Sequence, residues 1–273
     1  MRTASWTWQT CSEEESEAWM AHQNVCSESW WREFFESADS IPLSFFPGEE
    51  ETEEQVEGLV SLLDLQAGEA VADICCGMGR HAVPLAERGM DVLALDASDM
   101  MLRIAKVLGG GTEGLQLVRG DAADLPLRDE SFDVMLNLFN SFGYFLDEGQ
   151  NVRVLEEVVR CLRPDGRFLM ETRNRSYQIL YAPYYQEVTR ADGSCAIIRC
   201  KYDEGEHRLT SVWSDPDDPD QILHEASIRL YGLAELREMF DSVGLEVDAV
   251  YGEYDARPFE GWERMLILQA HRR

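Results

Sequence analysis

Apolar and polar positions follow two different periods along most of the chain. Short apolar runs typical of buried strands occur at 70–75, 91–96, 115–119, 132–138, 166–172, 245–251 and 264–270. Stretches with the apolar spacing of a helix occur at 52–65, 81–88, 100–108, 151–161 and 233–243. Strands that alternate with helices favour an α/β fold, in which a parallel sheet has helices on both faces.

The stretch 184–232 breaks this alternation. It contains four short apolar runs, at 186–190, 196–202, 208–214 and 222–231. Turn-forming pairs separate them, among them Asp192 with Gly193 and Glu204 with Gly205. The pattern predicts an antiparallel meander, which we interpret as a β flap inserted into the α/β fold.

Aromatic residues gather near the N-terminus among many glutamates. Trp30, Trp31, Phe34 and Phe35 share one face if this segment is helical. Two interpretations stay open: a helix that docks on the body of the protein, and an aromatic lid over a site. We therefore divide the chain into an aromatic and acidic N-terminal cap at 1–54 and a domain at 55–273, with the flap at 184–232 over the substrate.

The chain is strongly acidic. Its 273 residues include 24 Lys and Arg against 52 Asp and Glu, which gives a formal net charge of −28. Such a surface repels phosphate backbones and anionic lipid heads, so we expect neither a nucleic acid nor a membrane as a partner. The charge either steers a cationic amine substrate or only keeps the chain soluble. A homodimer, or a protein partner held by the acidic surface, also stays open.

Cysteine usage and apolar run lengths indicate the compartment. No apolar stretch reaches the about 20 residues of a membrane span, and the N-terminus lacks a secretory pattern. The seven cysteines form no Cys-x-x-Cys pair. We therefore expect a reducing cytoplasm, with neither a disulfide framework nor a zinc site. The five histidines are scattered along the sequence, so no metal site is predicted.

The segment 71–81, with the sequence VADICCGMGRH, carries the first candidate chemistry. It predicts a buried strand that runs into a glycine-rich turn and then into a helix. Gly77 and Gly79 allow the backbone to approach a ligand, and the helix N-terminus offers free N–H groups to a negative group. Asp73, at the end of the strand, can accept a hydrogen bond from an ammonium group.

Two further acids follow the next two strands. Asp96 ends one strand, where a carboxylate can bind both hydroxyls of a ribose. Asp121 follows the other, where it can accept from an adenine amine. Each aspartate alone could merely cap a following helix or turn. All three in this order line one sheet edge, which is where open α/β sheets bind ligands.

These residues resemble the first motif of class I S-adenosylmethionine-dependent methyltransferases, usually D-x-G-x-G-x-G, with Cys75 at the first glycine position. The variant Cys-Cys-Gly-x-Gly-Arg-His is similar to one small-molecule subgroup, as are the segments 137–145, 162–168 and 251–255. The resemblance extends from about Thr52 to the C-terminus. It implies a Rossmann-like seven-stranded methyltransferase sheet, to which the helical cap and the flap are added.

The resemblance also implies a cofactor, S-adenosylmethionine, and its product S-adenosylhomocysteine. The residues that it assigns to the cofactor are Asp73, Cys75, Cys76, Gly77, Gly79, Asp96, Ala97, Met101, Asp121, Ala122, Asn137 and Leu138. Asp73 and the backbone of 75–79 would hold the methionine end. Asp96 would bind the ribose, and Asp121 the adenine amine.

A methyl group on a sulfonium is already activated, so the protein has mainly to align the acceptor. We expect Phe139, Asn140 and Tyr144 to do this by positioning, without a clear general base. The substrate-binding candidates are Trp31, Phe35, Arg173, Asn174, Tyr184, Trp213 and Tyr254. Arg173 either selects an anionic part of the substrate or is paired with a surface acid.

The sequence therefore predicts an S-adenosylmethionine-dependent methyltransferase that acts on a small molecule. N- or O-methylation in specialised metabolism, such as antibiotic biosynthesis, is the expected setting. Two alternatives remain: a protein of this fold with another reaction, such as a cyclisation, and a non-catalytic partner subunit. An NAD-dependent dehydrogenase would leave Asp121 and the segment 162–168 unexplained.

Overall fold

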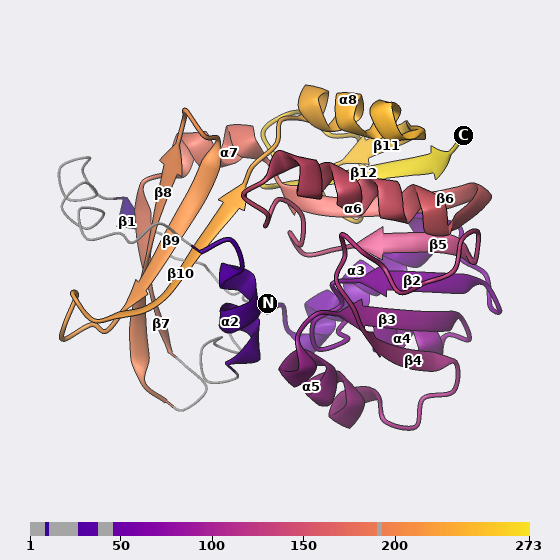
Figure 1. Ribbon diagram of the computed structural model, residues 1–273, viewed down its shortest axis with the longest axis horizontal. Coiled ribbons are helices and arrows are strands. Elements are labelled where there is room, and N and C mark those ends of the chain that lie inside the picture. The colour runs from indigo at the N-terminus through magenta and orange to yellow at the C-terminus, as the bar shows by residue number, and fades with distance from the viewer. Residues whose placement is uncertain (1–8, 11–26, 38–45, 190–192) are drawn as a thin grey trace.

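Two β-sheets of different size lie side by side in the computed structural model (Figure 1). The structure describes residues 9–10, 27–37, 46–189 and 193–273. The predicted cap at 1–54 is therefore described only in part, at 9–10, 27–37 and 46–54. None of the described helices has the length and apolar character needed to cross a bilayer.

The larger sheet has seven strands in the order β11-β12-β6-β5-β2-β3-β4. Their bounds are β2 (Ala70–Ile74), β3 (Asp91–Asp96), β4 (Leu115–Arg119), β5 (Phe132–Asn137), β6 (Leu162–Arg173), β11 (Leu245–Tyr251) and β12 (Met265–Arg272). The five strands β2 to β6 pair in parallel, whereas β12 is antiparallel to both β6 and β11. The predicted seven-stranded sheet is confirmed, and β6 begins earlier than the sequence pattern indicates.

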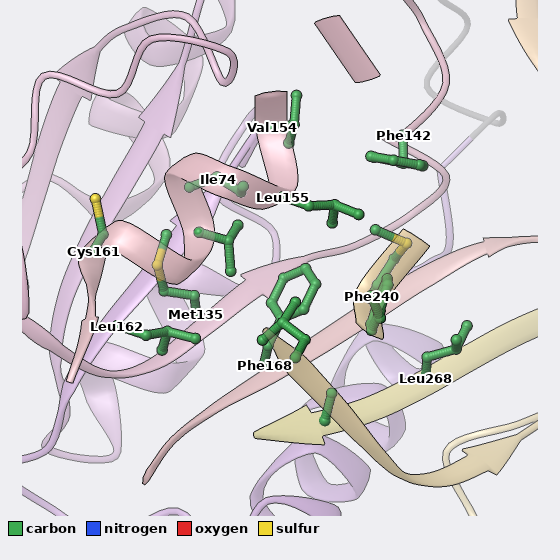
Figure 2. Close-up of a cluster of buried hydrophobic side chains, with 14 of the residues drawn as sticks. Ile74, Met135, Phe142, Val154, Leu155, Cys161, Leu162, Phe168, Phe240 and Leu268 are labelled. Atoms are coloured by element: carbon green, nitrogen blue, oxygen red, sulfur yellow. The ribbon is translucent and has the colours of Figure 1, made fainter. Parts of the chain in front are cut away.

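Helices cover both faces of this sheet, as predicted. One face carries α6 (Glu148–Cys161) and α8 (Leu233–Val243), and the other carries α3 (Glu49–Leu62), α4 (Ala82–Glu87) and α5 (Asp99–Gly109). Figure 2 shows the core under α6 and α8, where Leu155 and Phe240 pack with Phe168 of the sheet. Since both faces are buried, the central strands are almost continuously apolar, which is why periodicity located them.

The smaller sheet is the predicted antiparallel flap. Its order is β1-β7-β8-β9-β10, with β1 (Gln9–Thr10), β7 (Tyr184–Thr189), β8 (Cys195–Asp203), β9 (Arg208–Ser214) and β10 (Ile222–Arg229). Every pair is antiparallel. The helix α7 (Arg175–Tyr181), which the sequence pattern does not predict, leads into it. Ile179 and Leu180 of this helix are exposed, so the helix lacks the apolar stripe that would reveal it.

The aromatic helix α2 (Trp30–Glu36) lies between the two sheets (Figure 1). Trp30, Trp31 and Phe34 are buried and pack with Trp213 of the flap and Met101 of α5. The backbone carbonyl of Phe35 accepts a hydrogen bond from Ser98 Oγ at 2.7 Å. The helix thus contacts the smaller sheet on one side and, on the other, α5 and the loop after β3 of the larger sheet.

We expect Gly58→Ala to destabilise the protein, although alanine is the better helix former. A Cβ at Gly58, within α3, would lie 2.5 Å from both the carbonyl oxygen and the Cβ of Tyr254. The backbone of that loop would have to move, which we expect to cost about 1–3 kcal/mol of unfolding free energy, against about 1 kcal/mol of helix propensity gained. Urea denaturation measures the difference. The control Ser61→Ala, at an exposed site of the same helix, should change stability by less than about 0.5 kcal/mol; equal effects of the two substitutions would contradict the prediction.

Candidate functional site

A cavity of ≈ 1110 Å³ opens at the carboxyl ends of the parallel strands. Its walls come from the loops after β2, β3, β4 and β5, from α2 and α3, and from the flap. All but three of the predicted site residues line it; the exceptions are Gly79, Asn137 and Asn174. The tertiary structure thus brings together residues that lie between 31 and 254 in the sequence.

The loop after β2 is held in an unusual backbone conformation. Gly77 and Gly79 have positive φ angles of 56° and 77°, and Cys75 shares this left-handed region with φ 60°. Glycine adopts that region without strain, which explains the glycine of the usual motif and makes Cys75 a strained substitute. Gly79 packs beneath the loop, where a Cβ would lie 3.2 Å from Ala105 Cβ. At Gly77, which lines the cavity, a Cβ would meet no atom within 4 Å, so the backbone there is open to a ligand.

Asp96 fixes this loop to the neighbouring strand. Its Oδ2 accepts from the backbone N–H of Gly77 at 2.8 Å, and its Oδ1 accepts from Ser98 N–H at 2.8 Å. Burial raises the pKa of the Asp96 carboxyl, while these backbone hydrogen bonds oppose the shift. One carboxylate thus links the ends of β2 and β3 and lines the cavity.

Buried polar atoms without partners mark the end of β2. The Oδ2 of Asp73 and the Nη2 of Arg80 have no hydrogen-bond partner in the described part of the chain. Burial raises the pKa of Asp73 to about 7, although the nearby Arg80 lowers it. Because unpaired buried polar groups are costly, these atoms fit a ligand that carries both a donor and an acceptor.

A second buried carboxylate, Glu171 of β6, lies on the same side of the sheet. Its Oε2 accepts from the Tyr254 hydroxyl at 2.8 Å and from the backbone N–H of Phe139 at 2.8 Å. Burial raises its pKa, and Arg80 is among the groups that oppose this shift. The guanidinium of Arg80 also lies 4.9 Å from the centre of the Phe139 ring. No sequence pattern predicted a role for Arg80 or Glu171, although a glutamate inside an apolar strand is a signal that could have pointed to Glu171.

The loop after β5 is tied to β6 by side chains and backbone. Phe139 and Asn140 have positive φ angles of 53° and 61°, and Asn140 N–H donates to the carbonyl of Glu171. The Oδ1 of Asn140 accepts from Arg173 N–H at 3.0 Å. Asn137, the last residue of β5, is buried, and both polar atoms of its side-chain amide lack a partner in the described structure. It does not line the cavity.

Asp121 faces the N-terminal helix. Its Oδ2 accepts from Arg32 of α2 at 2.7 Å, and its Oδ1 accepts from Ala123 N–H. No sequence pattern pointed to Arg32, because the partners of this helix depend on where it packs in the tertiary structure. The ion pair therefore attaches the N-terminal helix to the sheet edge at which Asp73 and Asp96 also lie.

Aromatic rings form the wall opposite the strand ends. Tyr144 stacks on Phe35 with ring centres 6.1 Å apart and lies 5.1 Å from Trp30. Trp31 and Trp213 also line this region. Burial raises the pKa of Tyr144, so its hydroxyl stays protonated at neutral pH. Tyr144 can donate a hydrogen bond here, but it does not act as a phenolate base.

Three of the predicted acceptor-side residues have distinct surroundings. Arg173 and Tyr184 meet at the flap end of the cavity, where Arg173 Nη1 lies 3.5 Å from the Tyr184 hydroxyl. Asn174 instead caps α7 by accepting from Ser176 N–H, and its amide donates to the carbonyls of Gly261 and Glu263. Its side chain therefore caps α7 and holds the loop before β12, and Asn174 is not among the residues that line the cavity.

Comparison with known proteins agrees with this geometry. Residues 71–166 match the family model described as a methyltransferase domain. The chain is 28% identical over 194 residues to a demethylmenaquinone methyltransferase of Shouchella clausii, covering 67% of this chain and 73% of that protein. It is 27% identical over 219 residues to a cypemycin N-terminal methyltransferase of Streptomyces, covering 75% and 84%.

The fold also aligns with solved methyltransferases. The CcbJ methyltransferase of Streptomyces caelestis superposes with a TM-score of 0.73 at 21% identity, over 90% of this chain and 99% of that one. Several other structures that align are S-adenosylmethionine-dependent enzymes. The strand order, with its single reversed strand, and the cavity at the strand ends define a class I methyltransferase architecture. The chain is an S-adenosylmethionine-dependent methyltransferase.

The raised pKa of Asp73 predicts a pH-dependent effect of Asp73→Asn on the stability of the ligand-free protein. The folded carboxyl, with a pKa of about 7, binds a proton that the unfolded chain, with a pKa near 3.8, has already released. Unfolding free energy is therefore lost as the pH rises toward 7, and the substitution removes this loss. Relative to the native chain, Asp73→Asn should gain about 3 kcal/mol between pH 5 and pH 8 in urea denaturation.

The matched control is Asp133→Asn. Asp133 accepts from the N–H of Ala70, at the other end of β2, and its pKa is lowered, despite burial, by hydrogen bonds that include one from Arg163. Its contribution changes only below about pH 4, so the control should show the same stability difference at pH 5 and pH 8. A pH-independent effect of Asp73→Asn would show that the carboxyl is ionised in the folded protein.

Proposed function

We propose that this enzyme methylates an amine of a small-molecule acceptor. The single observation that carries the proposal is the cavity of ≈ 1110 Å³ between the strand ends, α2 and the flap. Sites for single small ligands measure about 300–1,000 Å³, so this cavity has room for a methyl donor and a small acceptor together. A macromolecular acceptor would not need an interior wall of aromatic rings.

The buried polar atoms support a specific fit of the donor. The unpartnered Oδ2 of Asp73 and Nη2 of Arg80 suit the ammonium and the carboxylate of its methionine part. Asp96, at the end of β3, would bind the ribose hydroxyls, and Asp121 the adenine amine. The neighbouring backbone of 75–77 and the side chains of Ala97, Met101, Ala122 and Leu138 complete this half of the cavity.

Methyl transfer in this cavity would depend on positioning. S-adenosylmethionine, when bound, supplies a methyl group that its sulfonium has already activated. Phe139 and Asn140 are held rigidly to β6 by Glu171 and by the backbone of Arg173. Tyr144, stacked on Phe35, forms a flat aromatic wall that would exclude water and stabilise the positive charge of the sulfonium. Fixing two reactants at reacting distance can supply roughly 7–11 kcal/mol of a barrier.

The acceptor side of the cavity favours an amine over an alcohol. Its titratable side chains include Tyr144, Tyr184 and Cys200, and burial raises the pKa of each. They are therefore protonated at neutral pH and cannot take a proton from a hydroxyl acceptor. A neutral amine attacks without such a base, because it releases its proton after methylation. At the part of the cavity that these three side chains line, the same reasoning disfavours O-methylation.

The setting that we propose is specialised metabolism. The relatives include a cypemycin N-terminal methyltransferase, and CcbJ also comes from a Streptomyces species. The flap and the aromatic helix are additions to the methyltransferase sheet that line the acceptor side. Such additions suit the recognition of one unusual metabolite.

Replacing Asp96 tests the donor site. Asp96→Asn keeps the shape but removes the charge, and we expect S-adenosylhomocysteine to bind at least about tenfold more weakly, since hydrogen bonds to charged groups contribute about 1.5–3 kcal/mol. Isothermal titration calorimetry measures the Kd. The control Asp91→Asn lies at the exposed start of the same strand and should bind within about twofold of the native chain. Unchanged binding in Asp96→Asn would remove Asp96 from the site.

The reaction itself is tested by incubating the protein with S-adenosylmethionine and a panel of small amines and of their hydroxyl analogues. We expect S-adenosylhomocysteine to form together with an amine product that is heavier by one CH2. Mass spectrometry detects both products. Methylation of the hydroxyl analogues alone would contradict the proposed acceptor, and donor binding without any S-adenosylhomocysteine would support a different reaction, such as a cyclisation.

A further inference from the structure

The flap end of the cavity differs in charge from the donor end. Asp73, Asp96 and Asp121 line the donor end, whereas the flap end contains the guanidinium of Arg173. Tyr144 lines the same cavity, and besides burial both Arg173, which lowers it, and Asp96, which raises it, influence the pKa of its hydroxyl. A molecule that extends from Tyr144 toward the flap could therefore meet Arg173.

Arg173 stands out among the four arginines that line the cavity. Arg257 pairs with Asp255 at 2.5 Å, and Arg80 donates to Gln55 and Thr52. The described residues give Arg173 no acidic partner, and its guanidinium contacts the neutral hydroxyl of Tyr184 at 3.5 Å. Of the two roles that the sequence left open for Arg173, pairing with a surface acid finds no support in the described structure.

The surroundings of Arg173 favour an anion. Arg264, the fourth of these arginines, precedes β12 and lies next to Arg173, and its carbonyl accepts from Asn174 N–H at 3.0 Å. Burial, and then the charge of Arg173, lower the pKa of the Arg264 guanidinium. Glu171 is among the groups that oppose this shift, so Arg264 already has a carboxylate near it, whereas an anion bound at Arg173 would offset the repulsion between the two guanidinium groups.

Neutral donors complete this end of the cavity. Burial keeps the Tyr184 hydroxyl protonated and raises the pKa of the Cys200 thiol to about 11, although Arg173 lowers it. Neither group becomes an anion at neutral pH, so neither can neutralise Arg173. The Tyr184 hydroxyl donates to Gln178 at 3.3 Å and accepts from Arg173, which fixes the guanidinium at the cavity wall.

We propose that Arg173, with the Tyr184 hydroxyl beside it, forms an anion subsite that binds a carboxylate of the methyl acceptor. This inference rests on the proposed function and narrows its substrate class to an amine that also carries an acidic group. With its carboxylate bound at the flap end, the acceptor would place its amine near Tyr144 and the donor end. A guanidinium suits this role because it offers two parallel donors to one carboxylate.

A matched pair of aromatic probes tests the subsite without knowledge of the substrate. 1-Anilinonaphthalene-8-sulfonate carries an anionic group, and N-phenyl-1-naphthylamine is the same ring system without it. Both are titrated by fluorescence into protein saturated with S-adenosylhomocysteine. In Arg173→Gln we expect the Kd of the anionic probe to rise at least tenfold, while the Kd of the uncharged probe stays within twofold.

The control variant is Arg103→Gln, which removes the same charge from an exposed position of α5, where Arg103 pairs with Asp99. It should leave both probe affinities within twofold. An equal loss of affinity for the anionic probe in both variants, or no loss of that affinity in Arg173→Gln, would overturn the proposed subsite. Binding of S-adenosylhomocysteine by each variant shows whether the variant is folded.

Arg173→Lys keeps the charge and covers the case in which Arg173→Gln does not fold. Its Kd for the anionic probe should stay within about fivefold of that of the native chain. In the native chain, only the anionic probe should lose affinity between about 20 and about 300 mM salt, as ionic binding requires. Salt-independent binding of that probe would overturn the proposal. If S-adenosylhomocysteine does not bind the native chain, the proposed function fails, and the same titrations without it still decide the subsite.

Discussion

The site depends on one hydrogen-bonded carboxylate, that of Asp96. By accepting from Gly77 N–H and Ser98 N–H, it holds the loop after β2 against the start of the next loop. Backbone hydrogen bonds from Cys76 N–H to the Leu95 carbonyl and from Gly79 N–H to the Cys76 carbonyl hold the same loop, whose left-handed residues need such support from their surroundings. The same carboxylate faces the cavity, so the group that organises the loop is also available to a ligand. Positioning and binding are thus two functions of one side chain.

Burial of charge is the main electrostatic feature of the cavity. Asp73 and Glu171 are both buried, and burial is the largest cause of the raised pKa of each. Glu171 is satisfied by Tyr254 and the backbone of Phe139, whereas Asp73 retains an unpartnered oxygen. A buried acceptor without a partner is costly to the free protein. A positively charged ligand at this position would satisfy it.

The second sheet and α2 convert an open sheet edge into a cavity. Class I sheets bind ligands at the carboxyl ends of their strands, and this edge alone would be open to solvent. Here Trp30 and Phe34 pack into the flap, while the Phe35 carbonyl and Arg32 bond to the loops of the large sheet. Aromatic residues can serve both surfaces because each ring buries a large apolar area and needs few polar partners.

The sequence by itself determined the order of the strands and helices apart from β1 and α7, the flap, and most of the residues that line the cavity. Those features depend on local patterns: apolar runs, turn pairs, and acids such as Asp96 at the ends of strands. The positions of Arg80 and Glu171 beside Asp73, and of Arg32 beside Asp121, were decided only by the tertiary structure, since their partners lie on other elements. Asn174 shows the converse, because a local pattern placed it by a site while tertiary packing used its side chain as a cap. Sequence spacing fixes which backbone ends meet at a sheet edge, but the direction of each long side chain is set by contacts between distant elements.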